Sequence, residues 1–362
     1  MILTILNKDR EPVGDIDDAI SVIWDKHYRE EGYVEIYAAV TLRTVELLRE
    51  GYYITRADDP CVARIYSIYT NTNEEGVDVI VASAKFAHGL LKQRLVWNRT
   101  RIYGNVEQVV RSLIIDNCMS PTDAQGNAMR ERIIEELEMA DAHGLADRMN
   151  ATQVSYKNLL EYVLEICATF HYGVRAIMKA GEKQIAIDIY EGTDRSYRQT
   201  AQPYVVFSQE HENLLGFSYK YDTSTTANVA LVGGEGEGAE RVLASVGTAS
   251  GLDRFEVFVD AKDISSTIEG TDGGEGTTYT REEYEAMLEE RGLLSMAPAS
   301  ESFDASVDLS RSYEYRKDFD VGDIVTIHDL RTGAYVNVRL MSVLESEDSS
   351  GYTLTPTFEV DY

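Results

Sequence analysis

The residue types that most often hold metals or form covalent links are present in this sequence but scattered. None of the six histidines belongs to an HExxH motif or to a close cluster with cysteines or carboxylates at zinc-ligand spacing. The histidines are His27, His88, His143, His171, His211 and His328. The three cysteines are far apart and odd in number, which argues against a disulfide framework: Cys61, Cys118 and Cys167. Cys167 falls at an apolar helical spacing, so a core position is expected. We predict no metal site.

Carboxylates are too abundant for sequence alone to select a catalytic pair. A glycosidase needs only two, at a separation that the fold sets, and the chain has 62 acidic residues. Neither GxSxG nor GxxxxGK[ST] occurs. The acidic stretches TDGGEGTT and GGEGEGAE lack the alternating aspartates and the spacing of an EF-hand loop, so they indicate acidic loops. We predict no catalytic and no cofactor-binding residue, and a chain that is not an enzyme.

The charge is the most informative bulk property. The 62 acidic and 34 basic residues give a formal net charge of −28. Such a surface repels phosphate backbones and offers few sites that would release counterions from DNA. Sequence-specific nucleic-acid binding is therefore not expected. Two interpretations stay open, namely solubility and a surface past which DNA slides without binding.

One glycine-rich stretch, VGGEGEGAER, stands out as a candidate structural or inter-subunit loop. Glycine lets a backbone turn sharply or approach another chain closely. A basic and acidic set accompanies the loop and commonly pins such a loop to a sheet, with an inter-subunit contact as the alternative. The candidate residues are Gly233, Gly234, Gly236, Gly238, Arg241, Arg254 and Glu256.

The elements that would position these residues are mainly strands. With 362 residues, two or three domains are expected. In residues 1–104, apolar and polar side chains alternate. For example, the apolar Val34, Ile36 and Ala38 alternate with Glu35 and Tyr37, which predicts a β domain. Residues 105–195 predict an α/β helical domain. Three helices are expected there. The first follows an N-cap at Asn105, the second runs from Met129 past Leu137, and the third ends at Gly173.

The C-terminal part, residues 196–362, returns to strands. Thr280 and Glu283 form a capping box, which predicts a short helical insertion at about 271–302. The fold class is therefore α+β and β-rich. No apolar run reaches the length of about 18 residues that a membrane helix needs, so no stable membrane insertion is expected. The N-terminus indicates a strand and a turn instead of a signal peptide.

Several segments carry a resemblance to a known family. They are VEIYAAVT, LLREGYYI, HGLLKQRLVW, YGNVEQVVRSLI, VGGEGEGAER, LDRFEVFVDAKDI and YEYRKDFDVGDIVTI. Together, in order and spacing, they resemble the siphophage tail-tip proteins of the ReqiPepy type, relatives of the hub of phage baseplates and of the N-terminal hub regions of tail-associated lysins. The resemblance spans nearly the whole chain. Two features depart from it: the strong acidity, and the absence of the fibre, lectin or hydrolase domain that many relatives carry after the hub.

The resemblance implies an architecture and a role. It implies a homotrimer with two tube-forming β-barrel-like domains per chain and the helical α/β domain between them. The ring would connect the tail tube to the tip and gate DNA passage during ejection. The implied partners are a distal tail protein ring, a tail spike or fibre, and the tape-measure protein, while DNA passes without specific binding. The implied location is the tail tip of a virion, assembled in the host bacterial cytoplasm.

Two alternatives belong to other functional classes. The first is a tail-associated cell-wall or polysaccharide hydrolase, which requires a positioned acid and base in a cleft. The second is a host-glycan adhesion module that uses the tyrosine-rich surface of the first region. Most of these tyrosines lie at alternating strand positions, which favours packing roles: Tyr33, Tyr37, Tyr52, Tyr53, Tyr66 and Tyr69.

Overall fold

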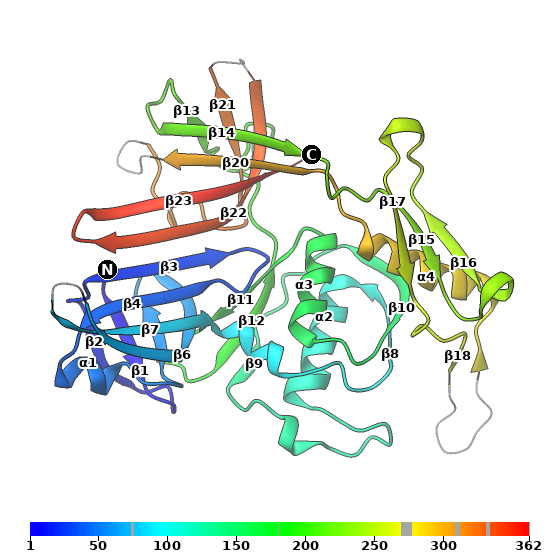
Figure 1. The fold of residues 1–362 in the computed structure, drawn as a ribbon, viewed down its shortest axis with the longest axis horizontal. Coiled ribbons are helices and arrows are strands. Elements are labelled where there is room, and N and C mark those ends of the chain that lie inside the picture. Colours follow the sequence, from blue (N-terminus) through cyan, green and yellow to red (C-terminus); the bar gives the residue numbers. More distant parts are fainter. Residues whose placement is uncertain (74–75, 180, 269–276, 308–311, 331–333, 362) are drawn as a thin grey trace.

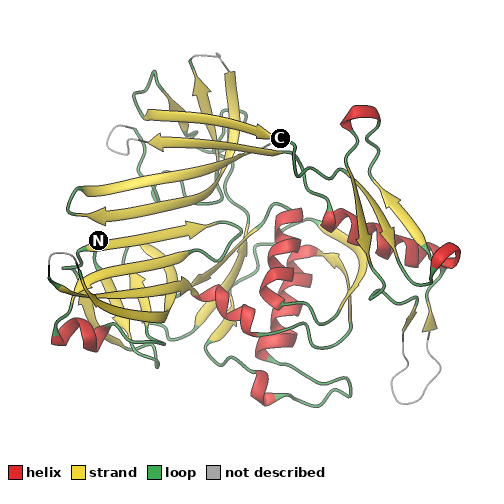
Figure 2. Ribbon diagram, in the orientation of Figure 1, coloured by secondary structure: helices red, strands yellow, loops and turns green. Residues whose placement is uncertain are grey.

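The computed structural model of the chain describes residues 1–73, 76–179, 181–268, 277–307, 312–330 and 334–361. Strands predominate over helices (Figure 2), which confirms the prediction of a β-rich chain. A single sheet of 16 strands extends through most of the molecule. Within the described part of the chain, no helix is long and apolar enough to cross a membrane.

The first region folds into strands around an apolar core. Its elements are β1 (Leu3–Leu6), β2 (Pro12–Ile16), β3 (Ser21–His27), β4 (Tyr33–Ala39), α1 (Leu42–Leu47), β5 (Tyr53–Arg56), β6 (Asp59–Thr72) and β7 (Asp78–Phe86). Strands β3, β4, β7 and β6 are antiparallel neighbours, and β1 joins β2 to β5. The predicted alternation in β4 is confirmed, because Val34, Ile36 and Ala38 are buried with Trp24.

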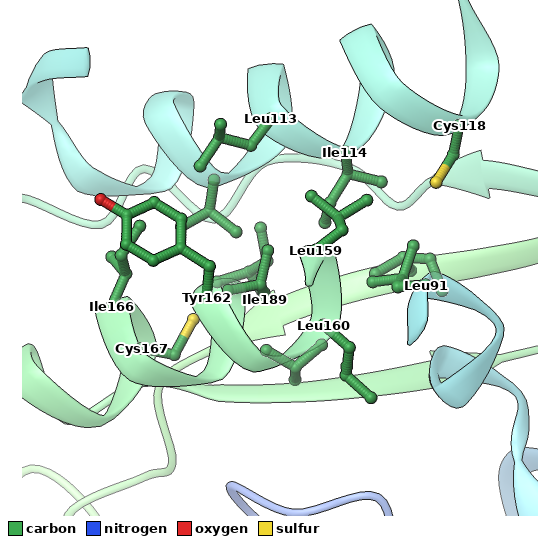
Figure 3. Close-up of a cluster of buried hydrophobic side chains, with 14 of the residues drawn as sticks. Leu91, Leu113, Ile114, Cys118, Leu159, Leu160, Tyr162, Ile166, Cys167 and Ile189 are labelled. Carbon is green, nitrogen blue, oxygen red and sulfur yellow. The ribbon is translucent and has the colours of Figure 1, made fainter. Parts of the chain in front are cut away.

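The middle region holds two helices that pack together over strands. Its elements are the 3₁₀ helix η1 (Ala87–Gln93), β8 (Thr100–Asn105), α2 (Val106–Ile114), the π-helical turn η2 (Ile115–Met119), η3 (Arg130–Arg132), β9 (Leu137–Met139), β10 (Arg148–Val154), α3 (Leu159–Thr169), β11 (Gly173–Ile177) and β12 (Ile185–Tyr190). Figure 3 shows the apolar core here, with Leu113, Leu159, Ile166 and Cys167 among its labelled side chains. The core position expected for Cys167 is therefore confirmed.

Two predictions in the middle region had opposite outcomes. Asn105 is the N-cap of α2, since its side chain accepts a hydrogen bond from the Gln108 N–H. The helix predicted from Met129 past Leu137 is wrong. That stretch contains only the short η3, and then β9, which pairs in parallel with β12. Pairing with a distant strand overrides a short apolar spacing that is compatible with a helix.

The C-terminal region adds strands to the same sheet. They are β13 (Val206–Ser208), β14 (Leu214–Asp222), β20 (Ser300–Val307), β21 (Ile324–Asp329), β22 (Ala334–Asp348) and β23 (Gly351–Val360). Strand β22 pairs antiparallel with β3, so Ser342 faces His27 and Glu345 faces Trp24. This pairing joins the N-terminal and C-terminal β regions into one continuous sheet (Figure 1). We call it the β3–β22 junction.

Between β14 and β20 the chain leaves the large sheet, and we call residues 223–299 the excursion. Its elements are β15 (Val229–Gly233), η4 (Gly238–Glu240), β16 (Leu243–Val246), η5 (Gly251–Asp253), β17 (Glu256–Asp260), β18 (Thr267–Ile268), β19 (Thr277–Thr278) and α4 (Arg281–Ser295). Strands β16, β15 and β17 form a small sheet with α4 against one face (Figure 1). The capping box of Thr280 and Glu283 is confirmed.

The excursion is longer than the insertion predicted at about 271–302. Strands β14 and β20 are antiparallel neighbours, with Asp222 opposite Ser300, so the departure from the sheet begins already at residue 223. The predicted insertion contained α4 but not β15, β16 and β17, because the sequence pattern assigned residues 196–270 to the strands of the C-terminal part. Part of the predicted insertion, residues 271–276, lies outside the described residues. The domain boundaries at 104 and 195 stay predictions.

Candidate functional site

The glycine-rich loop lies in the excursion, where it follows β15 and leads through η4 towards β16. Three of its four glycines lie against atoms of their own chain. A Cβ on Gly233 would lie 2.5 Å from the Arg241 guanidinium carbon, and one on Gly234 would lie 2.5 Å from the Tyr284 hydroxyl. Gly236 combines a φ of +97° with a close approach to the backbone of Glu240. Glycine is therefore required here by contacts within the chain.

Arg241 fastens this loop to β17. Its guanidinium donates to the carbonyl of Gly233 at 2.8 Å and to the carbonyl of Gly234 at 3.1 Å. It also pairs with Asp260 at 2.5 Å. A planar guanidinium has enough donors to hold two carbonyls and a carboxylate at once. The acidic partner of Arg241 is thus Asp260, which the sequence did not single out.

Arg254 and Glu256 form a separate pair at 2.5 Å, and Arg254 also donates to the carbonyl of Ala249. Glu256 is at the start of β17 and Asp260 at its end, so at about 3.3 Å per residue the two ion pairs are roughly 13 Å apart along the strand. The structure thus divides the predicted set of charges into two groups. A contact between subunits at either group stays a prediction.

The scattered histidines and cysteines remain scattered in the fold. Within the described residues, no group of three or more histidine, cysteine or carboxylate side chains is arranged to hold a metal ion. Cys61, Cys118 and Cys167 are all free and buried. Burial raises the pKa of the Cys118 and Cys167 thiols to about 12. His88 is buried as well, and burial lowers its pKa to about 4.

The tyrosines of the first region divide between core and surface. Tyr53 is buried, in agreement with the packing role expected for it. Tyr66 and Tyr69 on β6 are exposed by 51% and 61%, and Lys85 lies over the Tyr66 ring. The packing role expected for the tyrosines thus holds for Tyr53 but not for these two.

A buried network of charges lies at the β3–β22 junction, and we call it the junction network. Its centre is Glu345, whose side chain is fully buried. Both oxygens of Glu345 accept from Arg316, at 2.9 and 2.8 Å, and one also accepts from Arg56 at 3.1 Å. The Tyr352 hydroxyl donates to the same carboxylate at 2.6 Å. Asp58 pairs with both arginines.

A second part of the junction network surrounds Lys26 of β3. Its ammonium lies 3.4 Å from Asp59 and 3.1 Å from Asp320, and both Lys26 and Asp59 are buried. Burial alone would lower the pKa of Lys26, but the negative groups around it, including these two carboxylates, raise it. Burial would likewise raise the pKa of Asp59, but Lys26, the hydrogen bonds with Cys61 and the charge of Arg316 together lower it. The pair is therefore ionised on both sides.

The junction network was missed at the level of sequence, although one signal for it exists. Val22, Trp24 and Lys26 share one face of β3, so a lysine occupies a position that alternation assigns to the core. Glu345 follows Val343 in the same way on β22. A charged residue at a core-facing position requires a buried partner. The identity of that partner depends on strand pairing, which the sequence does not specify.

The comparisons with known proteins agree with this architecture. The family model described as Siphovirus ReqiPepy6 Gp37-like protein matches residues 2–358. The chain belongs to this family. The predicted resemblance is therefore confirmed over nearly the whole length. No curated protein matches the chain.

Solved structures share the fold of this Gp37-like protein over its full length. A tail protein from Neisseria meningitidis matches with a TM-score of 0.59 at 9% identity, covering 99% of this chain and 96% of the other. The 43 kDa tail protein of prophage MuSo2 from Shewanella oneidensis matches with a TM-score of 0.59 at 8% identity, covering 99% and 98%. The prophage tail protein gp18 from Listeria monocytogenes matches with 0.53 at 12%, covering 99% and 94%. The fold and the family support a structural role in a phage tail.

Proposed function

We propose that this Gp37-like protein is a baseplate hub at the tail tip, where three copies form a ring that connects the tail tube to the tip and gates DNA passage. The observation that carries this proposal is the match of fold to three tail proteins, two of them from prophages, over 99% of the chain, together with the family. No residue is catalytic in this role. The position is the tail tip of the virion, reached by assembly in the host bacterial cytoplasm.

The β3–β22 junction supports a tube built from two β regions in each chain. Because β3 and β22 are hydrogen-bonded neighbours, the two regions form one continuous sheet and are fixed relative to each other. The junction network adds ion pairs with demanding geometry at the same place. Each region would act as a barrel-like tube domain, and three chains would then supply six, enough for a ring that matches a hexameric tube.

The face of this sheet opposite its core is the surface proposed to line the channel. On β4, Tyr33, Glu35 and Tyr37 alternate with the buried Val34 and Ile36, so they point away from the core. A net charge of −28 makes the whole protein repel phosphate. DNA would therefore pass the ring without specific binding.

The proposed partners follow from that position. A distal tail protein ring would contact the hub on the side of the tail tube. A spike or fibre and the end of the tape-measure protein would contact it on the other side. The excursion, which carries the glycine-rich loop, extends from the side of the molecule away from β1–β7 (Figure 1) and is available for such contacts.

The test is the mass of the purified full chain by light scattering across a concentration series, with negative-stain imaging of the same samples. A trimer, or a ring with a central hole, is the expected result. Tail particles imaged by electron microscopy provide the decisive second measurement, because they show the chain in its assembled position. A monomer in solution together with tail particles that lack three copies of the chain at the tip would overturn the proposal.

A further inference from the structure

A groove lies between strand β8 and helix α2, in the middle region. Its volume is about 270 Å³, and its lining includes the four consecutive residues Thr100–Tyr103 of β8. Neighbouring residues of a strand point to opposite faces. A cavity that touches four in succession therefore runs along the edge of the strand and not across one face.

That edge of β8 is open. Within the described residues β8 pairs with β10 alone, in a sheet of two strands. An unpaired strand edge presents a row of backbone N–H and C=O groups, which is the template for pairing with a further strand. Two-stranded sheets are also marginal by themselves, so a third strand would add stability.

Helix α2 and the turn after it supply the opposite wall of the groove. Gln108, Ser112 and Asp116 are spaced by four residues and line it as one exposed row. Val109 and Leu113 form the apolar floor with Ile102 of β8, and all three are buried. The combination of an open strand edge, an apolar floor and a polar helical wall is the geometry in which proteins receive extended peptides.

The π-helical turn η2 fixes the far end of the groove. Asn117, in this turn, is buried, donates to the carbonyl of Leu113 at 2.9 Å and accepts from the backbone N–H of Trp97 at 3.0 Å. The turn also places Asp116 at the groove. Single π-helical turns of this kind recur at functional sites.

The charges in the groove select the chemistry of the occupant. The Asp116 carboxyl group makes no hydrogen bond or ion pair within the described part of the chain, and its partial burial raises its pKa. The cation nearest in the lining, Arg101, lies instead over the rings of Tyr103 and Tyr279, at 5.3 and 4.8 Å. An anion without a counter-charge favours a cationic group on whatever enters.

We propose that this groove binds an extended segment of a partner protein, which adds to β8 as a third strand and places a lysine or arginine against Asp116. The inference rests on the groove itself and stands independently of the proposed hub.

The experiment selects a displayed library of random linear peptides against the full chain. In the Ser112→Trp variant, the tryptophan at this exposed position is expected to fill the groove. Peptides that still bind this variant therefore bind elsewhere, and counter-selection removes them. Ser120→Trp is the matched control, because Ser120 is exposed just beyond η2 and does not line the groove. Enriched peptides are expected to carry a basic residue among alternating apolar residues. Their affinity should fall at least about tenfold in Ser112→Trp, a loss of about 1.4 kcal/mol, and stay unchanged in Ser120→Trp.

Two further measurements distinguish a strand addition from surface adhesion. Asp116→Lys should weaken the basic peptides and leave the fold unchanged, since Asp116 has no partner to lose. Backbone amide shifts on binding should concentrate in residues 100–105 and 108–117. The proposal is overturned if no enriched peptide binds Ser120→Trp more tightly than Ser112→Trp. It is also overturned if a peptide binds without changing the chemical shifts of the β8 amides.

Discussion

The β3–β22 junction and the excursion solve the same problem, the attachment of one part of the chain to another, in different ways. At the junction, strand pairing is combined with a buried network centred on Glu345 and Lys26. In the excursion, α4 covers one face of three strands through a small apolar core that includes Met287 and Leu288. Its other face leaves Leu231 and Phe258 exposed. A buried ion pair stabilises two parts only in one relative orientation, whereas apolar contacts tolerate a range of orientations because they are non-directional. The difference indicates that the orientation of the two β regions is specified more strictly than that of α4 on its small sheet.

The largest effect is expected from Glu345→Gln, which removes the charge shared by Arg56 and Arg316. The buried Arg56 and the half-buried Arg316 would then keep Asp58 as a shared partner but lose the fully buried carboxylate between them, which costs about 3 kcal/mol. Chemical denaturation of the full chain measures this free energy of unfolding. The matched control is Glu46→Gln, at an exposed position of α1, with an expected change within about 0.5 kcal/mol. Equal effects of the two variants would show that the network does not hold the junction.

Met287→Ala tests the excursion in the same terms. Met287 is fully buried against the small sheet, and its truncation should cost about 3 kcal/mol. Hydrogen exchange is the suitable measurement, because the loss should appear in amides of β15 and β17 and leave those of β3 and β22 protected. Leu293→Ala on the same helix is the control, since Leu293 is 39% exposed. Loss of protection in β3 would mean that the two parts unfold together.

Gly234→Ala tests whether close packing around the glycine-rich loop of the excursion excludes a side chain at position 234. The added methyl group would lie 2.5 Å from the Tyr284 hydroxyl and 2.9 Å from Leu288, so a cost of about 1–3 kcal/mol is expected. Gly238→Asn is the control in the same loop. Nothing lies within 4 Å of a Cβ there, and its φ of +56° suits asparagine. Thermal unfolding of both variants gives the comparison, and an equally large loss in Gly238→Asn would contradict the packing argument.

The smallest effect concerns pH at the junction. Burial alone would lower the pKa of His27, but the hydrogen bond with Asp25, at 2.9 Å, and the charges of Asp25 and Glu30 together raise it above the ordinary value of 6.5. Protonated His27 therefore stabilises the native state fully below pH 6.5, and this contribution is lost as the pH rises through the folded pKa. It should amount to less than about 1 kcal/mol. The difference in unfolding free energy between wild type and His27→Gln should shrink with rising pH, and a constant difference would contradict this assignment.

Local patterns in the sequence predicted local structure well. The alternation in β4 and the N-caps at Asn105 and Thr280 involve neighbours a few residues apart, and the structure confirms all three. The segment from Met129 to Leu137 failed because its outcome depends on β12, far along the chain.

The candidate site shows the same difference between contacts of residues close in sequence and contacts of residues far apart in sequence. The contacts of Arg241 with Gly233 and Gly234 lie within one loop, whereas Arg254 and Glu256, predicted as part of the same set, form a separate pair. The bond between Arg56 and Glu345 joins residues 289 positions apart. Arg56 is on β5 and Glu345 on β22, so the fold of the first region and the β3–β22 pairing together bring the two side chains into contact. No spacing in the sequence could reveal that these two residues are partners.

The position of the excursion has a consequence for how chains of this kind can change over time. Asp222 and Ser300 are opposite each other on neighbouring strands, so the two ends of the excursion emerge about 5 Å apart. Closing a longer or shorter loop between adjacent ends changes the free energy only slowly with length. One module can therefore be exchanged for another at this point while the register of the large sheet is preserved, which makes it the natural place for such proteins to diversify.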